Sequence, residues 1–111
     1  MKILLADDSD FFRYIFKEYL ISEGHKVIEF DNGKDAKIYL KKHKVDIIAT
    51  DNLMPHLDGI ELLKEFKDFK IPKLLITTEP TKELKSRAKK YGAKCVDKDL
   101  ENLMKFIKKI K

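Results

Sequence analysis

The sequence predicts an α/β protein built on a parallel sheet, and three observations support this fold class. Short apolar runs alternate along the chain with longer segments whose apolar residues recur at helical spacing. The runs are rich in β-branched residues and continuously apolar, which indicates strands buried on both faces. Strands that alternate with helices favour a parallel sheet, because right-handed crossovers then place helices on both faces.

The N-terminal part of the chain predicts two strand–helix units. The apolar run at 3–6 predicts a first strand, and apolar residues three and four positions apart predict an amphipathic helix over 10–23. A second strand is expected at 27–30, before an Asp-Asn-Gly turn at 31–33. The helix after this turn should extend to about Lys42.

Three further units complete the pattern. They are, in chain order, a strand at 45–49, a helix over 60–66, a strand at 74–76, a helix that Thr81 caps and Gly92 ends, a strand at 93–96 and a helix over 100–110. Five such units fill 111 residues and leave no room for another. We therefore expect a single domain over residues 1–111.

The stretch at 45–59, with the sequence VDIIATDNLMPHLDG, organises the rest of the chain. Its apolar run leads directly to Asp51. Met54-Pro55 then imposes an extended or turning backbone, and Asp58-Gly59 is typical of a turn into the next helix. Asp51 is thus expected at the carboxyl end of a central strand, which is where open α/β sheets bind ligands.

Four of the predicted strands end in polar residues that could share one cleft. Asp7 and Asp8 follow the first strand, and Asp51 follows the third. Thr77 follows the fourth strand and Lys98 the fifth. Each residue alone could cap a helix, open a turn or lie on the surface. Because parallel strands end at one edge of a sheet, we expect all five side chains to converge there.

The chemistry of this cleft follows from its residue types. Neighbouring carboxylates require raised pKa values or a cation. Oxygen ligands suit magnesium, manganese or calcium, and a magnesium ion held by few carboxylates leaves positions for a phosphoryl group. Lys98 and Thr77 supply a charge and a hydroxyl for the phosphoryl oxygens. Asp51 is then the natural nucleophile, forming an aspartyl phosphate.

These residues resemble the receiver domain of two-component response regulators, which has the chemotaxis-regulator-like, flavodoxin-like fold. The resemblance extends over essentially the whole chain, and its motifs are specific in their order and spacing. The matching pieces are LLADDS at 4–9, Asp51 with Met54-Pro55 and Asp58-Gly59, Ile76-Thr77, Gly92-Ala93, and Lys98. The resemblance implies the strand order 2-1-3-4-5 for a doubly wound sheet with five helices.

The resemblance also implies a phosphorelay function. A histidine kinase or a phosphotransfer protein would donate a phosphoryl group to Asp51. Asp8, Asp51 and the backbone carbonyl of Leu53 would bind Mg²⁺ directly, with Mn²⁺ as an alternative ion, and Asp7 would bind it through water. Apart from catalysing its own phosphorylation and dephosphorylation, such a protein is no enzyme.

The remaining implied roles concern the phosphate and the output. Lys98 would pair with the phosphate, and Thr77 would move to bind it by a hydrogen bond. The signal would pass to the face formed by the fourth helix, the fifth strand and the fifth helix, where a downstream target protein binds. We expect a stand-alone regulator, because no output domain follows the receiver in the sequence.

Composition and charge exclude several other classes of protein. No apolar run approaches the ~20 residues of a membrane span, and no signal peptide is evident. The single cysteine, Cys95, fits a reducing compartment, so we expect the cytoplasm. The chain has a net charge of +5, and the positive charge is concentrated at its C-terminal end, where residues 82–111 include 11 basic and 4 acidic residues. Nucleic-acid binding is not expected, because neither an aromatic-interleaved basic motif nor a helix-turn-helix pattern is present.

Two other functions use the same residues. A receiver-like binding module would act without phosphorylation, although the presence of all five polar residues argues against it. A magnesium-dependent phosphohydrolase would use Asp51 as nucleophile. Haloacid-dehalogenase-like enzymes place a second aspartate two residues after the nucleophile, where this chain has Leu53, and the sequence has no room for a cap domain.

Overall fold

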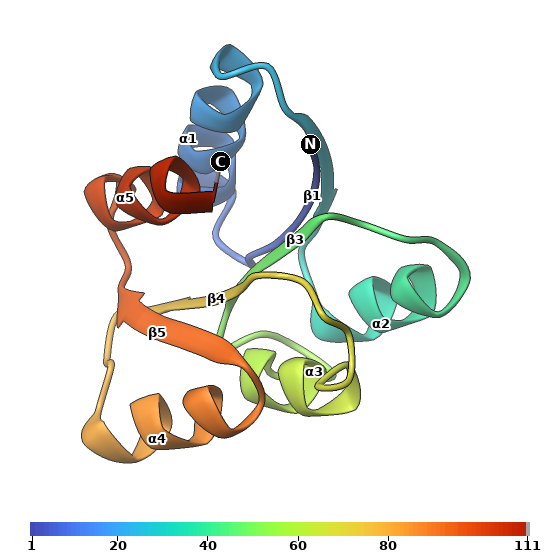
Figure 1. Cartoon of the computed structure of the whole chain (residues 1–111), viewed down its shortest axis with the longest axis vertical. Helices are drawn as coiled ribbons and strands as arrows, with labels where there is room; N and C mark the ends of the chain where they lie inside the picture. Colours follow the sequence, from blue (N-terminus) through green and yellow to red (C-terminus); the bar gives the residue numbers. More distant parts are fainter. Residues whose placement is uncertain (111) are drawn as a thin grey trace.

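The computed structural model describes residues 1–110, in which five strands alternate with five helices (Figure 1). All strand pairs are parallel, and the strand order is β2-β1-β3-β4-β5. The expected α/β class and strand order are both confirmed. The last residue of the expected domain 1–111 lies outside the described part. No helix within the described residues is both long and apolar enough to cross a bilayer.

The five strands each contain five residues. They are β1 (Lys2–Ala6), β2 (Lys26–Phe30), β3 (Ile47–Asp51), β4 (Lys73–Thr77) and β5 (Ala93–Asp97). Central strands β3 and β4 are buried along their whole length, whereas the edge strand β2 is partly exposed. The apolar run at 45–49 predicted β3 two residues early, because strand pairing begins only at Ile47. β5 extends one residue beyond its predicted end, to Asp97, so Lys98 follows it directly.

The helices follow the strands closely. They are α1 (Asp10–Ser22), α2 (Gly33–Lys42), α3 (Gly59–Glu65), α4 (Lys82–Lys90) and α5 (Leu100–Ile110). The caps of α1 to α4 are polar side chains that accept a backbone N–H from the first turn, namely Ser9, Asn32, Asp58 and Thr81. Because Ser9 caps α1, the carboxylates of Asp7 and Asp8 are not used as its cap.

Two apolar cores lie on opposite faces of the sheet (Figure 1). One joins the sheet to α2, α3 and α4, and the other joins it to α1 and α5. Leu4 and Ile48 enter the first core, while Ile3 and Ile47 enter the second, as expected for strands whose side chains alternate between two buried faces. Full burial of a side chain of this size contributes about 1.5–3 kcal/mol.

Gly59 brings α3 close to the strand end that carries Asp51. A Cβ atom at this position would overlap the carbonyl oxygen of Asp51. The Gly59 amide donates a hydrogen bond to the Asn52 carbonyl at 2.7 Å, and the Ile60 amide donates to the Asn52 side chain at 3.0 Å. The Asp-Gly turn therefore holds the loop between β3 and α3 against the end of β3.

Candidate functional site

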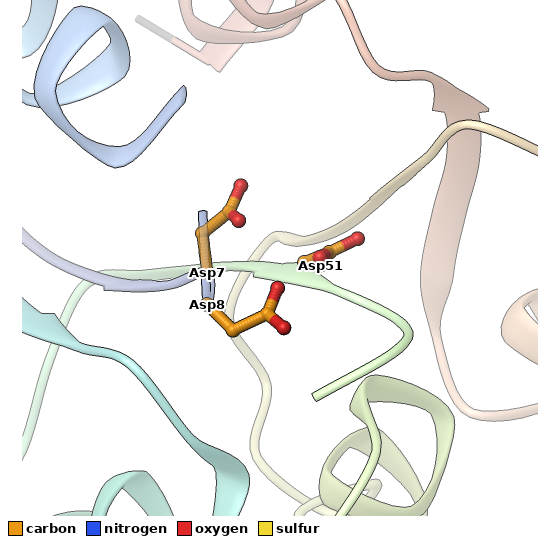
Figure 2. Close-up of side chains that lie close together, drawn as sticks. All are labelled: Asp7, Asp8 and Asp51. Atoms are coloured by element: carbon orange, nitrogen blue, oxygen red, sulfur yellow. The ribbon is translucent and has the colours of Figure 1, made fainter. Parts of the chain in front are cut away.

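Three carboxylates meet at the carboxyl edge of the sheet. Asp7 and Asp8 follow β1, and Asp51 ends β3 (Figure 2). One oxygen from each carboxylate lies within 4.8 Å of the others. Asp7 and Asp51 are buried, at 1% and 7% exposure, whereas Asp8 is exposed. The predicted convergence of these three residues is therefore present in the structure.

Lys98 lies between the two buried carboxylates. Its ammonium is 3.0 Å from Asp7 Oδ1 and 3.2 Å from Asp51 Oδ2. The Lys98 amide donates to the Thr77 carbonyl at 3.0 Å, which continues the pairing of β4 with β5 beyond Asp97. The ammonium also lies 4.6 Å from the centre of the Phe12 ring, a favourable cation–π position. The strand and the ring together fix the lysine inside the site.

The electrostatics of the site favour an additional cation. Burial and, to a lesser degree, the negative charge of Asp7 raise the pKa of Asp51 to about 6, although Lys98 lowers it in part. The pKa of Asp7 is also raised, again mainly by burial. The Lys98 ammonium pairs with two of the three clustered carboxylates, and in the described part of the chain no ion pair joins a cation to Asp8. Since the donors are all carboxylate oxygens, which hard cations prefer, these residues fit a magnesium ion.

Thr77 lies at the end of β4 and is buried. Its hydroxyl oxygen accepts a hydrogen bond from the Glu79 amide at 3.2 Å. Thr77 and Leu53 line the same hollow, of about 210 Å³, between the loop after β3 and helix α4. The threonine is therefore beside the site, and its hydroxyl interacts with its own loop rather than with Asp51.

Leu53 projects from the loop that follows Asp51 and is 68% exposed. With Asp8 it lines a second, open hollow of about 630 Å³. His56, in the same loop, has a φ of 72°, a left-handed conformation that is uncommon outside glycine. The Asn52 amide donates to Asp51 Oδ1 at 2.8 Å, which orients the carboxylate. Leu53 thus borders the cleft in which the resemblance to receiver domains implies that its backbone carbonyl binds the cation.

The sequence did not identify two residues that contact the site. Phe12 and Arg13 both lie on α1, where Phe12 is placed under Lys98 and the Arg13 guanidinium donates to the Asp7 carbonyl at 2.7 Å. Helical spacing had indicated only an apolar role for Phe12. An arginine on an amphipathic helix carries no signal of its own, because its partner depends on how the helix packs.

Comparisons with known proteins agree with this geometry. Residues 3–110 match the response regulator receiver domain family. The chemotaxis protein CheY of Bacillus subtilis (strain 168) is 40% identical over 67 residues, which cover 60% of this chain and 56% of that protein, so the match spans about half of its length. CheY of Halobacterium salinarum is 35% identical over 94 residues, covering 83% of this chain and 78% of that protein.

A solved structure extends the likeness to the whole fold. The CheX–CheY–BeF₃–Mg²⁺ complex from Borrelia burgdorferi contains a chain with a TM-score of 0.89 and 25% identity, covering 99% of this chain and 88% of that one. The cluster of Asp7, Asp8 and Asp51 is the acidic pocket typical of phospho-accepting regulators of this kind. Such proteins are not enzymes in the usual sense, since their chemistry is their own phosphorylation and dephosphorylation. From its sequence, its fold and this pocket, the chain belongs to the response regulator receiver domain family of two-component signalling.

Proposed function

We propose that Asp51 accepts a phosphoryl group from a histidine kinase or phosphotransfer protein, and that phosphorylation changes the binding of a downstream target. The observation that carries this proposal is the buried Asp51 carboxylate, with a lysine ammonium 3.2 Å away and two further carboxylates beside it. This arrangement supplies a nucleophile, a positive charge for the phosphate and oxygen ligands for a cation. The expected cytoplasmic location and the single-domain organisation over residues 1–111 belong to the same proposal.

The cation proposed for this site is Mg²⁺, with Mn²⁺ as an alternative. Asp8, Asp51 and the Leu53 carbonyl would bind it directly, and Asp7 through water. A bound ion supplies the positive charge that offsets the carboxylates and the phosphoryl oxygens. The exposure of Asp8 supports this assignment, because its carboxylate is accessible from solvent whereas Asp7 is enclosed beside Lys98.

The proposed reaction is a phosphoryl transfer onto a carboxylate. An oxygen of ionised Asp51 attacks phosphorus, an O–P bond forms, and the bond between phosphorus and the donor's histidine nitrogen breaks. The Lys98 ammonium keeps Asp51 ionised and pairs with the phosphoryl oxygens. In dephosphorylation, a separate reaction, water attacks phosphorus, the bond between phosphorus and the Asp51 oxygen breaks, and inorganic phosphate leaves while the carboxylate is restored.

The output step would start at Thr77. Its hydroxyl oxygen accepts a hydrogen bond from the Glu79 amide, and a phosphate on Asp51 would offer the Thr77 O–H a charged acceptor to which it can donate. Rotation of Thr77 toward the phosphate would release the Glu79 loop, which leads directly into α4. The face formed by α4, β5 and α5 would then present a different shape to a target protein. That the related Borrelia burgdorferi CheY is found in a complex with CheX supports a protein partner.

The test of this function is the intact mass of the protein after incubation with acetyl phosphate and magnesium chloride. We expect the wild type to gain one phosphoryl group, and excess chelator to prevent the gain. Asp51→Asn should gain none, and Asp8→Asn should need much more magnesium. A wild-type chain whose mass stays unchanged with both acetyl phosphate and a histidine kinase would favour the phosphorylation-independent binding module. Full labelling of Asp51→Asn would place the acceptor elsewhere.

A further inference from the structure

Arg13 connects three parts of the molecule around the acidic cluster. It lies in the first half of α1, and its side chain is only 17% exposed. Its Nη1 donates to the Asp7 carbonyl at 2.7 Å, its Nε donates to Glu29 on β2 at 3.1 Å, and its Nη2 donates to Asp10 at 2.6 Å. All three nitrogens of the guanidinium are therefore used, in three different directions.

The carbonyl that Arg13 binds belongs to the peptide bond between Asp7 and Asp8. This peptide joins two neighbouring aspartates, and both belong to the proposed cation site. The Asp7 amide, on the other side of the residue, donates to the Phe30 carbonyl at 3.0 Å and so continues the pairing of β1 with β2. The Ser9 amide donates to Asp7 Oδ1 at 2.9 Å. Asp7 is held on both sides, whereas the position of Asp8 depends on the peptide that Arg13 fixes.

We propose that Arg13 is a positioning residue for cation binding, which acts by fixing the Asp7–Asp8 peptide and thereby the direction of the Asp8 carboxylate. The inference rests on the proposed function, because the cation belongs to it. If Arg13 no longer bound the carbonyl, the peptide could rotate and turn Asp8 away from Asp51. Partners that orient metal ligands in this way typically contribute about 10- to 100-fold in metal affinity.

Glu29 fixes the guanidinium in turn. Its carboxylate accepts Arg13 on one oxygen and Lys17 Nζ on the other, at 3.1 Å and 2.8 Å. Lys17 lies one turn after Arg13 on α1 and shares this partner, and within residues 1–110 its ion pair is with Glu29, on the strand next to the Asp7–Asp8 loop, and not with that loop. Lys17 therefore provides a matched control: it has the same charge, lies on the same helix and bonds to the same glutamate.

The sign of the effect separates positioning from simple electrostatics. Removal of a positive charge near an acidic cluster lowers the repulsion felt by an incoming cation, so electrostatics alone predicts tighter Mg²⁺ binding in an Arg13 variant. Loss of a positioning hydrogen bond predicts weaker binding. A residue that serves only folding would lower the melting temperature and leave the affinity of the folded protein unchanged.

The experiment is a titration of metal-free protein with magnesium chloride, followed by the backbone amide NMR signals of Asp8 and Asn52. We expect Arg13→Met to raise the dissociation constant for Mg²⁺ about tenfold. Lys17→Met should bind as tightly as the wild type or slightly more tightly. Arg13→Lys should recover part of the affinity, because an ammonium can still reach one acceptor but cannot bond in three fixed directions.

The amide spectrum without metal reports whether each variant is folded, and Arg13→Lys keeps the test available if Arg13→Met unfolds. An Arg13→Met or Arg13→Lys protein that is folded and binds Mg²⁺ as tightly as Lys17→Met would overturn the inference and leave the proposed function intact. A wild-type protein that binds no Mg²⁺ at this site would overturn both the inference and the magnesium dependence of the proposed function.

Discussion

The ammonium of Lys98 lies 3.2 Å from Asp51 Oδ2, although 47 positions separate the two residues in the sequence. Both side chains are almost completely buried, at 5% and 9% exposure. Burial disfavours the charged form of each, and the contact with the opposite charge compensates for part of this cost. The pair therefore matters for stability as well as for the chemistry of Asp51.

We predict that Lys98→Met destabilises the metal-free protein most at neutral pH. The substitution leaves the buried Asp7 and Asp51 carboxylates without their cation, and loss of one partner of a buried pair costs about 3–5 kcal/mol. It should also raise the pKa of Asp51 above its present value of about 6. Urea unfolding at pH 7.5 and pH 4.5 measures the effect, which should shrink at the lower pH as the carboxylates become protonated.

Lys94→Met is the control for this prediction, because Lys94 also lies on β5 but is exposed. Its effect should be small at both pH values. Equal destabilisation of Lys98→Met at pH 4.5 and 7.5 would contradict the prediction, since it would mean that the lysine acts through packing alone.

The raised pKa of Asp51 predicts a pH dependence of stability in the absence of metal. Because the folded pKa of about 6 lies above the ordinary value of 3.8, the folded protein binds the proton more tightly than the unfolded chain. Stability contributed by this group is complete below pH ~4 and is lost as the pH rises through ~6. Asp51→Asn should remove this loss and be more stable than the wild type at pH 7, by on the order of 3 kcal/mol. Thermal unfolding from pH 4 to 7.5 with chelator measures the difference.

Addition of magnesium chloride provides the control for the pH prediction. A cation at the carboxylates should stabilise the wild type at pH 7 and reduce the advantage of Asp51→Asn. A wild type and an Asp51→Asn variant with parallel stability curves from pH 4 to 7.5 would show that Asp51 titrates alike in the folded and unfolded chains.

The sequence predicted the fold well because buried strands and amphipathic helices leave local patterns. Residues with a charge inside the sheet were harder to assign. The run at 74–76 predicted β4, whereas the strand begins at Lys73, which is 3% exposed. The Lys73 ammonium reaches back to the Phe69 carbonyl at 2.5 Å, so a long side chain buries its stem while its charged end finds an acceptor.

The site was predictable for a similar reason, and only in part. Asp7, Asp8 and Lys98 come just after strands and Asp51 ends one, so the topology alone brings them to one edge of the sheet. Arg13 reaches the Asp7 carbonyl from the side of α1, and this contact depends on how the helix is rotated and packed against β2. Such contacts join residues without a shared sequence pattern, and the structure is needed to find them.

Leu53 should lengthen the lifetime of the phosphorylated protein. It lies two residues after Asp51 and is exposed beside the hollow that Thr77 and Glu79 also line. A leucine side chain cannot orient an attacking water by hydrogen bonding, whereas asparagine can. We expect Leu53→Asn to increase the rate of dephosphorylation several-fold. This is less than the roughly 100-fold effect of a positioned general base, because asparagine can only orient the water. Decay of the phosphorylated mass after removal of acetyl phosphate measures the rate, and Leu53→Met, which stays apolar, is the control. An unchanged or slower decay in Leu53→Asn would exclude this role.

The proposed output face is rich in lysine. Figure 1 shows β5 between α4 and α5. Both helices carry lysines that are exposed to solvent. They are Lys82, Lys85, Lys89 and Lys90 on α4, and Lys105, Lys108 and Lys109 on α5. Acidic residues such as Glu83 and Glu101 are fewer on these helices. A solvated surface that keeps the protein soluble would have the same composition, so a binding measurement is needed to separate the two roles.

We predict that the α4–β5–α5 face binds an acidic protein surface, with an association rate that falls as salt rises. Exposed charges are screened beyond ~10 Å at 0.1 M ionic strength, and long-range attraction acts on the association rate more than on the affinity. A partner captured with the phosphorylated protein should bind more slowly to Lys85→Glu/Lys89→Glu, while Lys34→Glu/Lys41→Glu on α2 carries the same charge change and should bind normally. Phosphorylation adds negative charge at Asp51, at the end of β3 and not on this face, so we expect its effect on binding to come from the conformation around Thr77 and α4. The salt dependence should therefore be the same for both forms of the protein, while the affinity differs.

Binding that does not change with salt or in the α4 variant would assign the output to another surface. Equally tight binding to random-sequence DNA would favour a nucleic-acid role for these lysines.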